Sequence, residues 1–285
     1  MITCNIMGGL GNQLFQICAT IGYAMSRNKP FIFPRGKGGT PNRPTYWDNF
    51  LAPLQIFLRT DETIRMKSYR IHNEDPFQKY NGEWRDDNDK EEALKNVYLK
   101  GYYQSYKYFD CYYKTIIRLL RLEEQKTNTL NKYGGAKDNY ISMHFRLGDY
   151  KSLPNHHPIL SADYYKKSLE TILSMDPINI SHVLVFCEEE DETKVKEIIQ
   201  ECVKTELKPE LKWEIIDHSI PDWEQLLLMS LCRHNIIANS TFSWWGAYFN
   251  EHQDKIVCYP SVWFGPALSY VRSTEDLFPP SWTKI

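Results

Sequence analysis

The 285-residue sequence has no excess of charge of either sign and no long apolar run. Its 34 basic and 36 acidic residues give a net charge of −2, which argues against bulk electrostatic binding to nucleic acid or to a membrane surface. No apolar stretch reaches the length of a membrane span. We therefore expect no nucleic-acid partner and no stable membrane insertion.

Clustered cysteines are also lacking. The seven cysteines are scattered and form no C-x-x-C, so a zinc framework is not expected. Most lie in apolar periodic segments and are predicted to be small buried hydrophobes, and an odd, unclustered count fits a reducing compartment. Gly8 and polar neighbours interrupt the first apolar stretch, which does not resemble a signal peptide. The expected location is the cytoplasm.

Two common nucleotide-binding motifs are missing as well. No G-x-x-x-x-G-K-[ST] occurs, which excludes a P-loop. Gly9 and Gly11 begin a G-x-G-x-x-G spacing, but Leu14 stands at the third glycine position. The next expected strand, Phe31–Phe33, is followed by Pro34 and Arg35 instead of an acidic residue for a ribose. An NAD site is therefore not expected.

The most informative feature present is the glycine loop at residues 7–16. An apolar run, Ile2–Ile6, precedes it and an amphipathic segment, Gln13–Arg27, follows. Strand, glycine turn and helix together present backbone N–H groups at a helix N-terminus, which favours an anion. Asn12 and Gln13 add two amide side chains there. We interpret the loop as a phosphate or sugar site; the alternative is a tight turn that needs glycine for its geometry alone.

The rest of the first half is less regular. Residues 34–96 are rich in Pro, Gly, Tyr and Asn, a strand is expected at Val97–Gly101, and a long helix at Tyr108–Thr127. Lys132–Asn139, with two glycines, is the best candidate for a linker.

The second half alternates between strand and helix patterns. This alternation predicts βαβ units and a parallel sheet. The expected strands are Tyr140–Phe145, Val183–Cys187, Lys212–Ile216, Asn235–Ala238 and Lys255–Tyr259, and the expected helices are Ala162–Ser174, Glu192–Lys204, Trp223–Cys232 and Thr241–Glu251. We predict an α/β protein of two Rossmann-like domains, residues 1–131 and 139–285, that face each other across a cleft.

A second polar group ends the strand at Tyr140–Phe145. His144 and Arg146 alternate with apolar residues, although a parallel strand covered on both faces should be almost wholly apolar. Arg146 would face the ligand crevice at the carboxyl end of the strand, where its planar fork suits a phosphate. Asp149 could be a base or could fix the arginine. The alternative is a structural Arg–Asp pair with a locally satisfied histidine.

A third polar group follows the buried strand at 236–238. Its residues Asn239, Ser240, Thr241 and Ser243 form a turn of hydroxyls and an amide before a helix. Such an N-terminus exposes donors that suit a pyrophosphate. The alternative is ordinary N-capping, and Trp244 and Trp245 are expected to be packing residues.

These segments together resemble glycosyltransferase family 11, the α-1,2-fucosyltransferases. The resemblance spans nearly the whole chain and rests on five motifs in order. They are Gly8–Gln16, Gly101–Ser105 with Tyr108-Phe109, His144–Tyr150, His157–Ser161 with Tyr164-Tyr165, and Asn239–Ala247. The His-x-Arg-x-x-Asp element is also similar to that of α-1,6- and protein O-fucosyltransferases, which share the GT-B fold.

The resemblance implies transfer of L-fucose from GDP-β-L-fucose to a galactose 2-hydroxyl, with inversion. GDP-fucose and a galactoside acceptor glycan are the implied partners, and no cofactor is needed. The first domain would take the acceptor and the second would take GDP-fucose.

The same resemblance implies roles for individual residues. Arg146, His144 and Asp149 would be catalytic, with Arg146 at the departing phosphates and Asp149 as candidate base. The residues implied in substrate binding are Gly9, Gly11, Asn12, Gln13, Gln104, Asn239, Ser240, Thr241 and Ser243.

Two positions depart from the family pattern. Relatives often carry arginine where Leu147 stands, and the strand end Phe186–Glu189 lacks the Ser-Asp-Asp associated with members, which leaves any role of Glu188 or Glu189 open.

Asp87-Asn88-Asp89 matches the Asp-x-Asp of metal-dependent enzymes but lies in a charged run typical of solvated surface, so metal-independent catalysis is expected. The expected resemblance is to microbial or viral members, because animal members carry a membrane anchor. The alternatives are another linkage, such as α-1,6, or an inactive nucleotide- or carbohydrate-binding protein.

Overall fold

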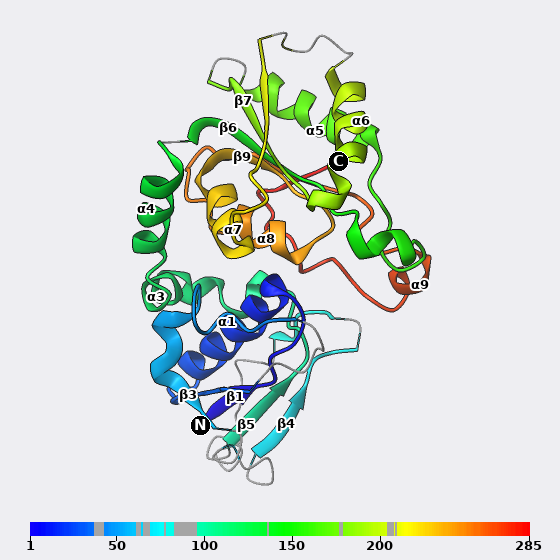
Figure 1. Cartoon of the computed structure of the whole chain (residues 1–285). Helices are drawn as coiled ribbons and strands as arrows, with labels where there is room; N and C mark the ends of the chain where they lie inside the picture. Colours follow the sequence, from blue (N-terminus) through cyan, green and yellow to red (C-terminus); the bar gives the residue numbers. More distant parts are fainter. Residues whose placement is uncertain are drawn as a thin grey trace. The chain divides into compact units, whose positions relative to one another are not determined.

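The computed structural model describes residues 1–36, 43–60, 64, 69–76, 78–82, 96–135, 137–176, 179–203, 208 and 210–285. The chain forms two compact units (Figure 1). The first contains Met1–Gln125 and Val271–Pro279; the second contains Lys126–Tyr270 and Pro280–Ile285. Within the described ranges, no helix has both the length and the apolar character needed to cross a bilayer.

The first unit is built on short parallel strands. Strands β1 (Ile2–Cys4), β5 (Asn96–Lys100) and β4 (Tyr69–Asn73) pair in that order. A bridge from Ile2 to Phe31 lies on the other side of β1, just before β2 (Phe33–Pro34), which pairs with β3 (Leu58–Arg59). The strand order therefore reverses between β1 and β5, which is where open α/β sheets bind ligands.

Helix α1 (Leu10–Ser26) begins directly after the loop that follows β1. Its apolar side chains, such as Leu14, Ile17 and Ile21, are fully buried. The loop is thereby fixed between a strand end and a helix N-terminus, as the glycine pattern predicted.

The second unit contains six parallel strands in the order β11-β10-β9-β6-β7-β8. The strands are β6 (Lys137–His144), β7 (His182–Phe186), β8 (Lys212–Ile215), β9 (Cys232–Ile236), β10 (Val257–Tyr259) and β11 (Thr283–Lys284). Counted along the chain, this is the 3-2-1-4-5-6 order of dinucleotide-binding Rossmann domains, with the reversal between β6 and β9.

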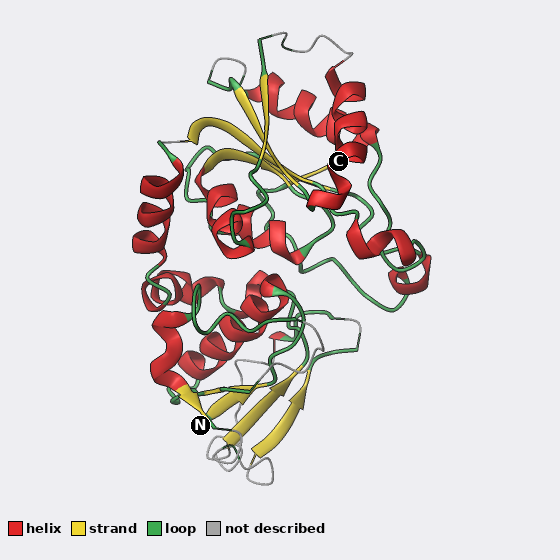
Figure 2. Ribbon diagram, in the orientation of Figure 1, coloured by secondary structure: helices red, strands yellow, loops and turns green. Residues whose placement is uncertain are grey.

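Helices cover both faces of this sheet (Figure 2). Ile141, Met143 and Phe145 share one apolar cluster with residues of α5 (Ala162–Met175) and α6 (Glu192–Val203). On the opposite face, Leu184 and Phe186 pack with residues of α7 (Asp222–Leu231), and Phe242 of α8 (Thr241–Tyr248) packs beside them. The predicted alternation along β6 is confirmed.

One predicted element is wrong. The expected continuous helix at Tyr108–Thr127 is interrupted: α3 (Tyr113–Leu119) and α4 (Leu122–Tyr133) are separate helices. Arg121, between them, has a φ of 49°, a left-handed conformation that ends a helix. The expected linker contains the last residues of α4 and the start of β6, and a short helix, α9 (Pro266–Ser269), precedes the return to the first unit.

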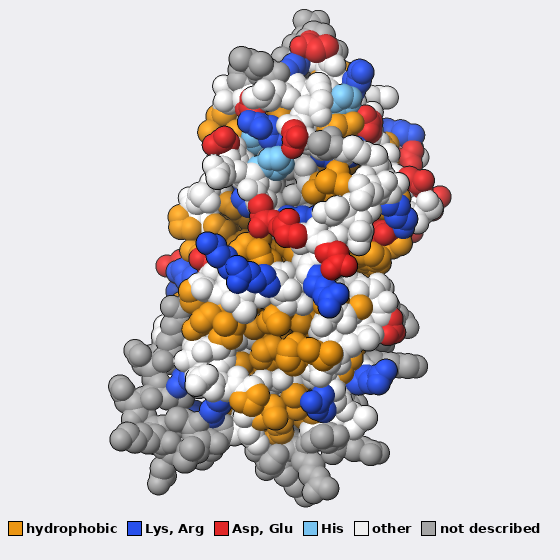
Figure 3. All heavy atoms as spheres, turned by 90° about the vertical axis from the view of Figure 1, so that its left-hand side faces the viewer, with side chains coloured by type: hydrophobic (Ala, Val, Ile, Leu, Met, Phe, Trp, Pro, Cys, Tyr) orange, Lys and Arg blue, Asp and Glu red, His pale blue; other side chains and the backbone are white. Residues whose placement is uncertain are grey.

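The surface shown in Figure 3 mixes acidic and basic side chains with apolar and neutral ones. This mixture agrees with a net charge of −2. Six of the seven cysteines are buried thiols, as expected; Cys111 is exposed.

Candidate functional site

The carboxyl ends of β6 and β9 carry most of the predicted residues of the second unit. β6 ends at His144, two residues before Arg146, and β9 ends at Ile236, shortly before Asn239 and Ser240. Met143 and Ile236 are paired across the two strands. The structure therefore brings the second and third polar groups together at the point where the strand order reverses.

Arg146 is a half-buried cation held by two carboxylates. Its Nη2 donates to Asp149 Oδ1 at 2.5 Å, and its Nη1 pairs with Glu188 Oε1. The guanidinium carbon lies 5.3 Å from the ring centroid of Tyr150. Burial lowers the pKa of Arg146, but Glu188 and Asp149 outweigh that effect and the pKa is raised overall. The site thus contains a fixed positive charge.

Glu188 is the residue that the sequence interpretation left open. It directly follows Cys187, beyond the end of β7, and β7 is the neighbour of β6 in the sheet. The pairing could have been anticipated only from the strand order, because residues at the ends of adjacent parallel strands lie at one edge.

Glu188, Glu190 and Asp191 have carboxylate oxygens within 4.8 Å of one another, a spacing that a metal ion could bridge. Two of these carboxylates already have cationic partners within the protein. Arg146 pairs with Glu188, and Lys151 pairs with Asp191. Asp191 also accepts from the Gly148 N–H at 2.7 Å, so the buried carboxylate shapes the turn after β6.

His144 is a buried, neutral histidine. Burial and the charge of Arg146 lower its pKa to about 3. Its ring centroid lies 5.7 Å from that of Phe242, and its Nδ1 is buried without a hydrogen-bond partner among the described residues. A neutral imidazole beside Arg146 can donate or accept a hydrogen bond without adding charge.

The turn after β9 begins α8. Ser240 is its N-cap, and the Ser240 Oγ accepts from the Phe242 N–H at 3.3 Å. Ser243 Oγ donates to the Ser240 carbonyl at 3.3 Å. Thr241, the first helical residue, is half-buried. Capping is therefore confirmed for Ser240, and contact of Ser240, Thr241 and Ser243 with a ligand stays a prediction.

Asn239 joins two neighbouring loops. Its Nδ2 donates to the carbonyls of Pro158 at 2.9 Å and Trp263 at 3.2 Å, and its main-chain carbonyl accepts from the Tyr150 hydroxyl at 3.0 Å. Within the described part of the chain, its buried Oδ1 has no partner. Asn239 thus orders the surroundings of the site, and ligand contact by its side chain stays a prediction.

The first unit brings Asn12 and Gln104 together. Asn12 lies in the first turn of α1 and Gln104 follows β5, the neighbour of β1. Gln104 Nε2 donates to Asn12 Oδ1 at 2.9 Å, and both residues are half-buried. Gly9 is the N-cap of α1 and Gly11 lies in its first turn.

Gln13 serves the conformation of the glycine loop. Its buried Nε2 donates to the carbonyls of Gly8 at 2.9 Å and Pro44 at 2.8 Å. Gln16 adds a two-way contact with the Met7 backbone at 2.9 and 3.1 Å. Contact of Gln13 with a substrate stays a prediction.

Four aromatic residues of the first unit, whose side chains are of the kind that stacks on sugars, lie in the irregular stretch at 34–96 or just after β5. Tyr46, Trp47 and Tyr103 are buried, and Tyr106 is half-buried. Trp244 and Trp245 are fully buried, which confirms packing. The Asp87-Asn88-Asp89 segment lies outside the described residues.

Comparison with known sequences gives a match over the whole chain. The model of glycosyl transferase family 11 matches residues 1–285. The O-antigen biosynthesis glycosyltransferase WbnK of Escherichia coli is 32% identical over 183 residues, an alignment that covers 60% of this chain and 57% of WbnK. A galactoside 2-alpha-L-fucosyltransferase of Caenorhabditis elegans is 25% identical over 100% of this chain and 79% of that protein. An alpha-1,2-colitosyltransferase of E. coli is 24% identical over 100% of this chain and 99% of that protein.

Two solved structures resemble the fold. The ADP-heptose LPS heptosyltransferase II of E. coli has a TM-score of 0.52 at 13% identity, over 100% of this chain and 90% of that one. POFUT1 in complex with GDP-fucose has a TM-score of 0.51 at 12% identity, over 90% of this chain and 97% of that one. The chain therefore has the GT-B fold.

Proposed function

Because the chain belongs to glycosyltransferase family 11, we propose that it transfers L-fucose from GDP-β-L-fucose to the 2-hydroxyl of a galactose-containing acceptor, with inversion. The observation that carries this proposal is that the fixed cation Arg146 and the N-terminus of α8 follow β6 and β9, the two strands between which the order of the second sheet reverses. The relative named as a galactoside 2-alpha-L-fucosyltransferase supports the sugar and the linkage.

The second unit would bind the nucleotide diphosphate. Negative charge develops on GDP as it departs, and fixed donors aimed at developing charge are worth a few kcal/mol each. Arg146 supplies a fork of donors, and the α8 N-terminus supplies backbone N–H groups. His144 would add a neutral hydrogen-bonding group without adding to the local charge.

For the proton of the acceptor hydroxyl we propose Asp149 as the base. Its side chain is 50% exposed, so an acceptor can reach it, whereas Glu188 remains to hold Arg146 in place. Asp149→Asn should lower kcat by about 10²-fold or more. Glu188→Gln, the matched control, removes the other carboxylate partner of Arg146, so GDP binding should weaken to a similar extent in both variants, while only Asp149→Asn should lose the kcat.

We propose catalysis without a metal ion, because Arg146 and the α8 donors provide the stabilisation of charge that a metal ion would otherwise supply. Transfer should therefore continue in excess chelator. If chelator abolishes turnover and added Mn²⁺ or Mg²⁺ restores it, catalysis without a metal ion is contradicted.

The first unit would bind the acceptor through the glycine loop, Asn12 and Gln104. Amide side chains hydrogen-bond sugar hydroxyls without adding charge. The irregular stretch at 34–96 and the Tyr102–Tyr108 segment would select the acceptor.

The direct test is incubation of the full chain with GDP-fucose and a panel of β-galactosides, with detection of released GDP and NMR of the product linkage. An α-1,2-linked product is expected. A 1,6-linked product would show that the sugar is transferred to a 6-hydroxyl instead of the proposed 2-hydroxyl. GDP binding without turnover on any acceptor would indicate a binding protein.

Arg146→Ala tests the mechanism. We expect kcat/KM to fall by at least about 10²-fold and GDP affinity to weaken, with the unfolding transition retained. Lys194→Ala, which removes an exposed lysine of α6, is the control for loss of a positive charge. Unchanged turnover in Arg146→Ala would contradict the mechanism.

Transfer of colitose is a second candidate, because the colitosyltransferase relative aligns over the whole chain. Colitose lacks the 3-hydroxyl of L-fucose. GDP-colitose should therefore be compared with GDP-fucose at equal concentration, and the higher kcat/KM identifies the donor.

A further inference from the structure

A half-buried carboxylate in the first unit holds the turn that presents Gln104. Glu74 directly follows β4, and β4 is the neighbour of β5. Its Oε2 accepts from the Tyr102 N–H at 2.7 Å and its Oε1 from the Gln104 N–H at 3.3 Å. The Tyr103 N–H is a third donor to the same carboxylate. Three successive backbone N–H groups converging on an anion form a nest.

The turn needs this anion because of its backbone geometry. Tyr103 has a φ of 53°, a left-handed conformation that is rare for a bulky side chain. Its ring is buried, and its hydroxyl donates to the His72 carbonyl at 2.7 Å. Gly101 has a φ of 152°, and a Cβ there would lie 2.3 Å from the Glu74 Cβ. The chain thus uses glycine where Glu74 approaches it most closely.

The position of Glu74 is unfavourable for a carboxylate by itself. Burial raises its pKa, and the three N–H groups and the charge of Arg272 oppose that rise. Burying an ionised group is costly unless hydrogen bonds compensate for the lost solvation. Glu74 therefore depends on the turn as much as the turn depends on Glu74.

The segment beyond the turn is fixed separately. Ser105 Oγ donates to the Asp276 carbonyl at 2.6 Å, and Lys107 pairs with the Asp276 carboxylate. Asp276 also accepts from the Tyr80 N–H at 3.0 Å. Glu74 and Asp276 thus hold the two sides of Gln104, whose side chain is the group that reaches Asn12.

We propose that Glu74 is a positioning residue of the acceptor site: it orders the Tyr102–Gln104 backbone so that the Gln104 amide meets Asn12. The proposal rests on the function proposed above for the first unit. The hydrogen bonds from Glu74 to the turn, and from Gln104 to Asn12, join the segments that follow β4, β5 and β1. Glu74 acts through Gln104 and needs no contact with the substrate.

A double-mutant cycle tests this coupling. Glu74→Gln should raise KM for the acceptor and lower kcat, with a loss in kcat/KM on the order of tenfold, while the GDP affinity stays unchanged. Gln104→Ala should give a similar loss. The double variant should be no worse than Gln104→Ala alone. Fully additive losses, or wild-type kinetics in Glu74→Gln, would refute the positioning role.

Two further variants separate positioning from general destabilisation. Glu275→Gln removes an exposed carboxylate of the same unit and should leave transfer unchanged. Glu74→Asp keeps the charge but is one methylene shorter, so it should recover part of the activity; it replaces Glu74→Gln in the cycle if that variant does not fold. Equal loss of acceptor and GDP binding in the Glu74 variants would mean a structural role only.

Amide hydrogen exchange gives a readout that needs no substrate. The Tyr102–Gln104 amides should exchange slowly in the wild-type chain and faster in Glu74→Gln, with Glu275→Gln as the control. Unchanged protection would overturn the proposal. If the wild-type chain transfers no sugar but this protection is lost in Glu74→Gln, the proposed function is wrong, whereas the ordering of the Tyr102–Gln104 backbone by Glu74 is supported.

Discussion

At the scale of single residues, Gly9 offers a sensitive probe for a ligand at the glycine loop. A Cβ added there would meet none of the described residues beyond its chain neighbours within 4 Å, and its backbone (φ −74°, ψ 177°) is open to any residue. Gly9→Ala should therefore cost at most about 1 kcal/mol of stability. Transfer should fall clearly, because the methyl group would occupy space that the substrate needs.

Urea unfolding and acceptor kinetics together check this prediction. Gly8→Ala is the contrasting variant, because Gly8 has a φ of 81° and its Cβ would lie 2.6 Å from Asn12 Nδ2. That variant should lose stability as well as activity. If Gly9→Ala transfers sugar at the wild-type rate, the glycine loop is not part of the substrate site.

Asn12 should matter for transfer more than for nucleotide binding. Asn12→Ala removes the partner of Gln104, so kcat/KM should fall on the order of tenfold. The GDP affinity measured by calorimetry should remain at the wild-type value, since the proposed nucleotide residues lie in the second unit. Equal losses in both measurements would contradict the assignment of the acceptor to the first unit.

Residue types at strand ends could be predicted from the sequence, but their partners could not. His144 and Arg146 interrupt an apolar strand, which made them visible as site candidates. Glu188 and Glu74 contact Arg146 and the Gln104 backbone only because β7 and β4 lie beside β6 and β5. Those adjacencies depend on the order of strands in the sheet, which no local pattern contains.

At the scale of elements, the turn after β6 depends on one glycine. Gly148 has a φ of 22°, and a Cβ there would lie 2.3 Å from Glu188 Oε2. Gly148→Ala should displace Glu188 from Arg146 and lower stability by about 1 kcal/mol. GDP should bind more weakly, as measured by calorimetry. Gly135→Ala is the control, because it too replaces a glycine with positive φ, at a position where the added Cβ has no neighbour within 4 Å in the part of the chain that the structure describes.

Elements with strong periodicity were predictable, and those held by tertiary contacts were not. The strands and helices that were expected in the second unit lie within a few residues of their expected positions, because buried strands and amphipathic helices have clear patterns; β11 and α9 were not expected. Strand β4 was missed: Ile71 is its one aliphatic residue, and it is 48% exposed. The break at Arg121 was missed because the apolar spacing continues through it.

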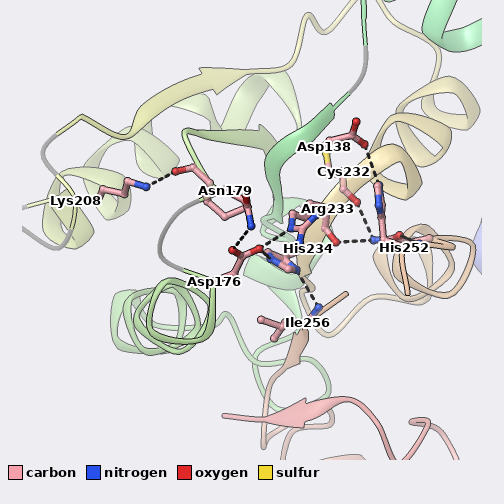
Figure 4. A network of polar contacts seen from close by, with 11 residues as sticks. Asp138, Asp176, Asn179, Lys208, Cys232, Arg233, His234, His252 and Ile256 are labelled. Carbon is pink, nitrogen blue, oxygen red and sulfur yellow. Dashed lines mark hydrogen bonds and ion pairs between the residues drawn. The ribbon is translucent and has the colours of Figure 1, made fainter. Parts of the chain in front are cut away.

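At the scale of the whole molecule, buried neutral histidines make stability depend on pH. Besides His144, His234 is fully buried: its Nδ1 accepts from the Ile256 N–H at 3.0 Å and its Nε2 lies 3.1 Å from Asp176 (Figure 4). Burial lowers the pKa of His234 although Asp176 opposes the shift. Arg233 also donates to Asp176 at 2.5 Å.

The sign of the effect follows from proton binding. A free histidine has a pKa of about 6.5, so below that pH the unfolded chain binds protons that the folded chain excludes. The free energy of unfolding should therefore fall as pH drops from about 6.5, by up to about 1.4 kcal/mol per pH unit for each such histidine. Below pH 3.8, Asp176 adds to the loss, because its pKa is lowered to about 2 in the folded state.

Urea unfolding between pH 7 and pH 5 measures this dependence. His234→Gln should be less stable than wild type at pH 7, because Ile256 loses its acceptor, yet its stability should fall less steeply with pH. The same slope in both proteins would exclude His234 as a contributor.

The interlaced path of the chain restricts how relatives of this protein can be recombined. Residues 271–279 belong to the first unit, and β11 in the second sheet comes after them. No single crossover can therefore exchange one intact unit between two family members. A chimera that keeps the Asp276 contacts with Ser105 and Lys107 must transplant 271–279 together with 1–125, so it has three junctions. A chimera with a single crossover after residue 125 should therefore contain a first unit whose 271–279 segment comes from the other parent.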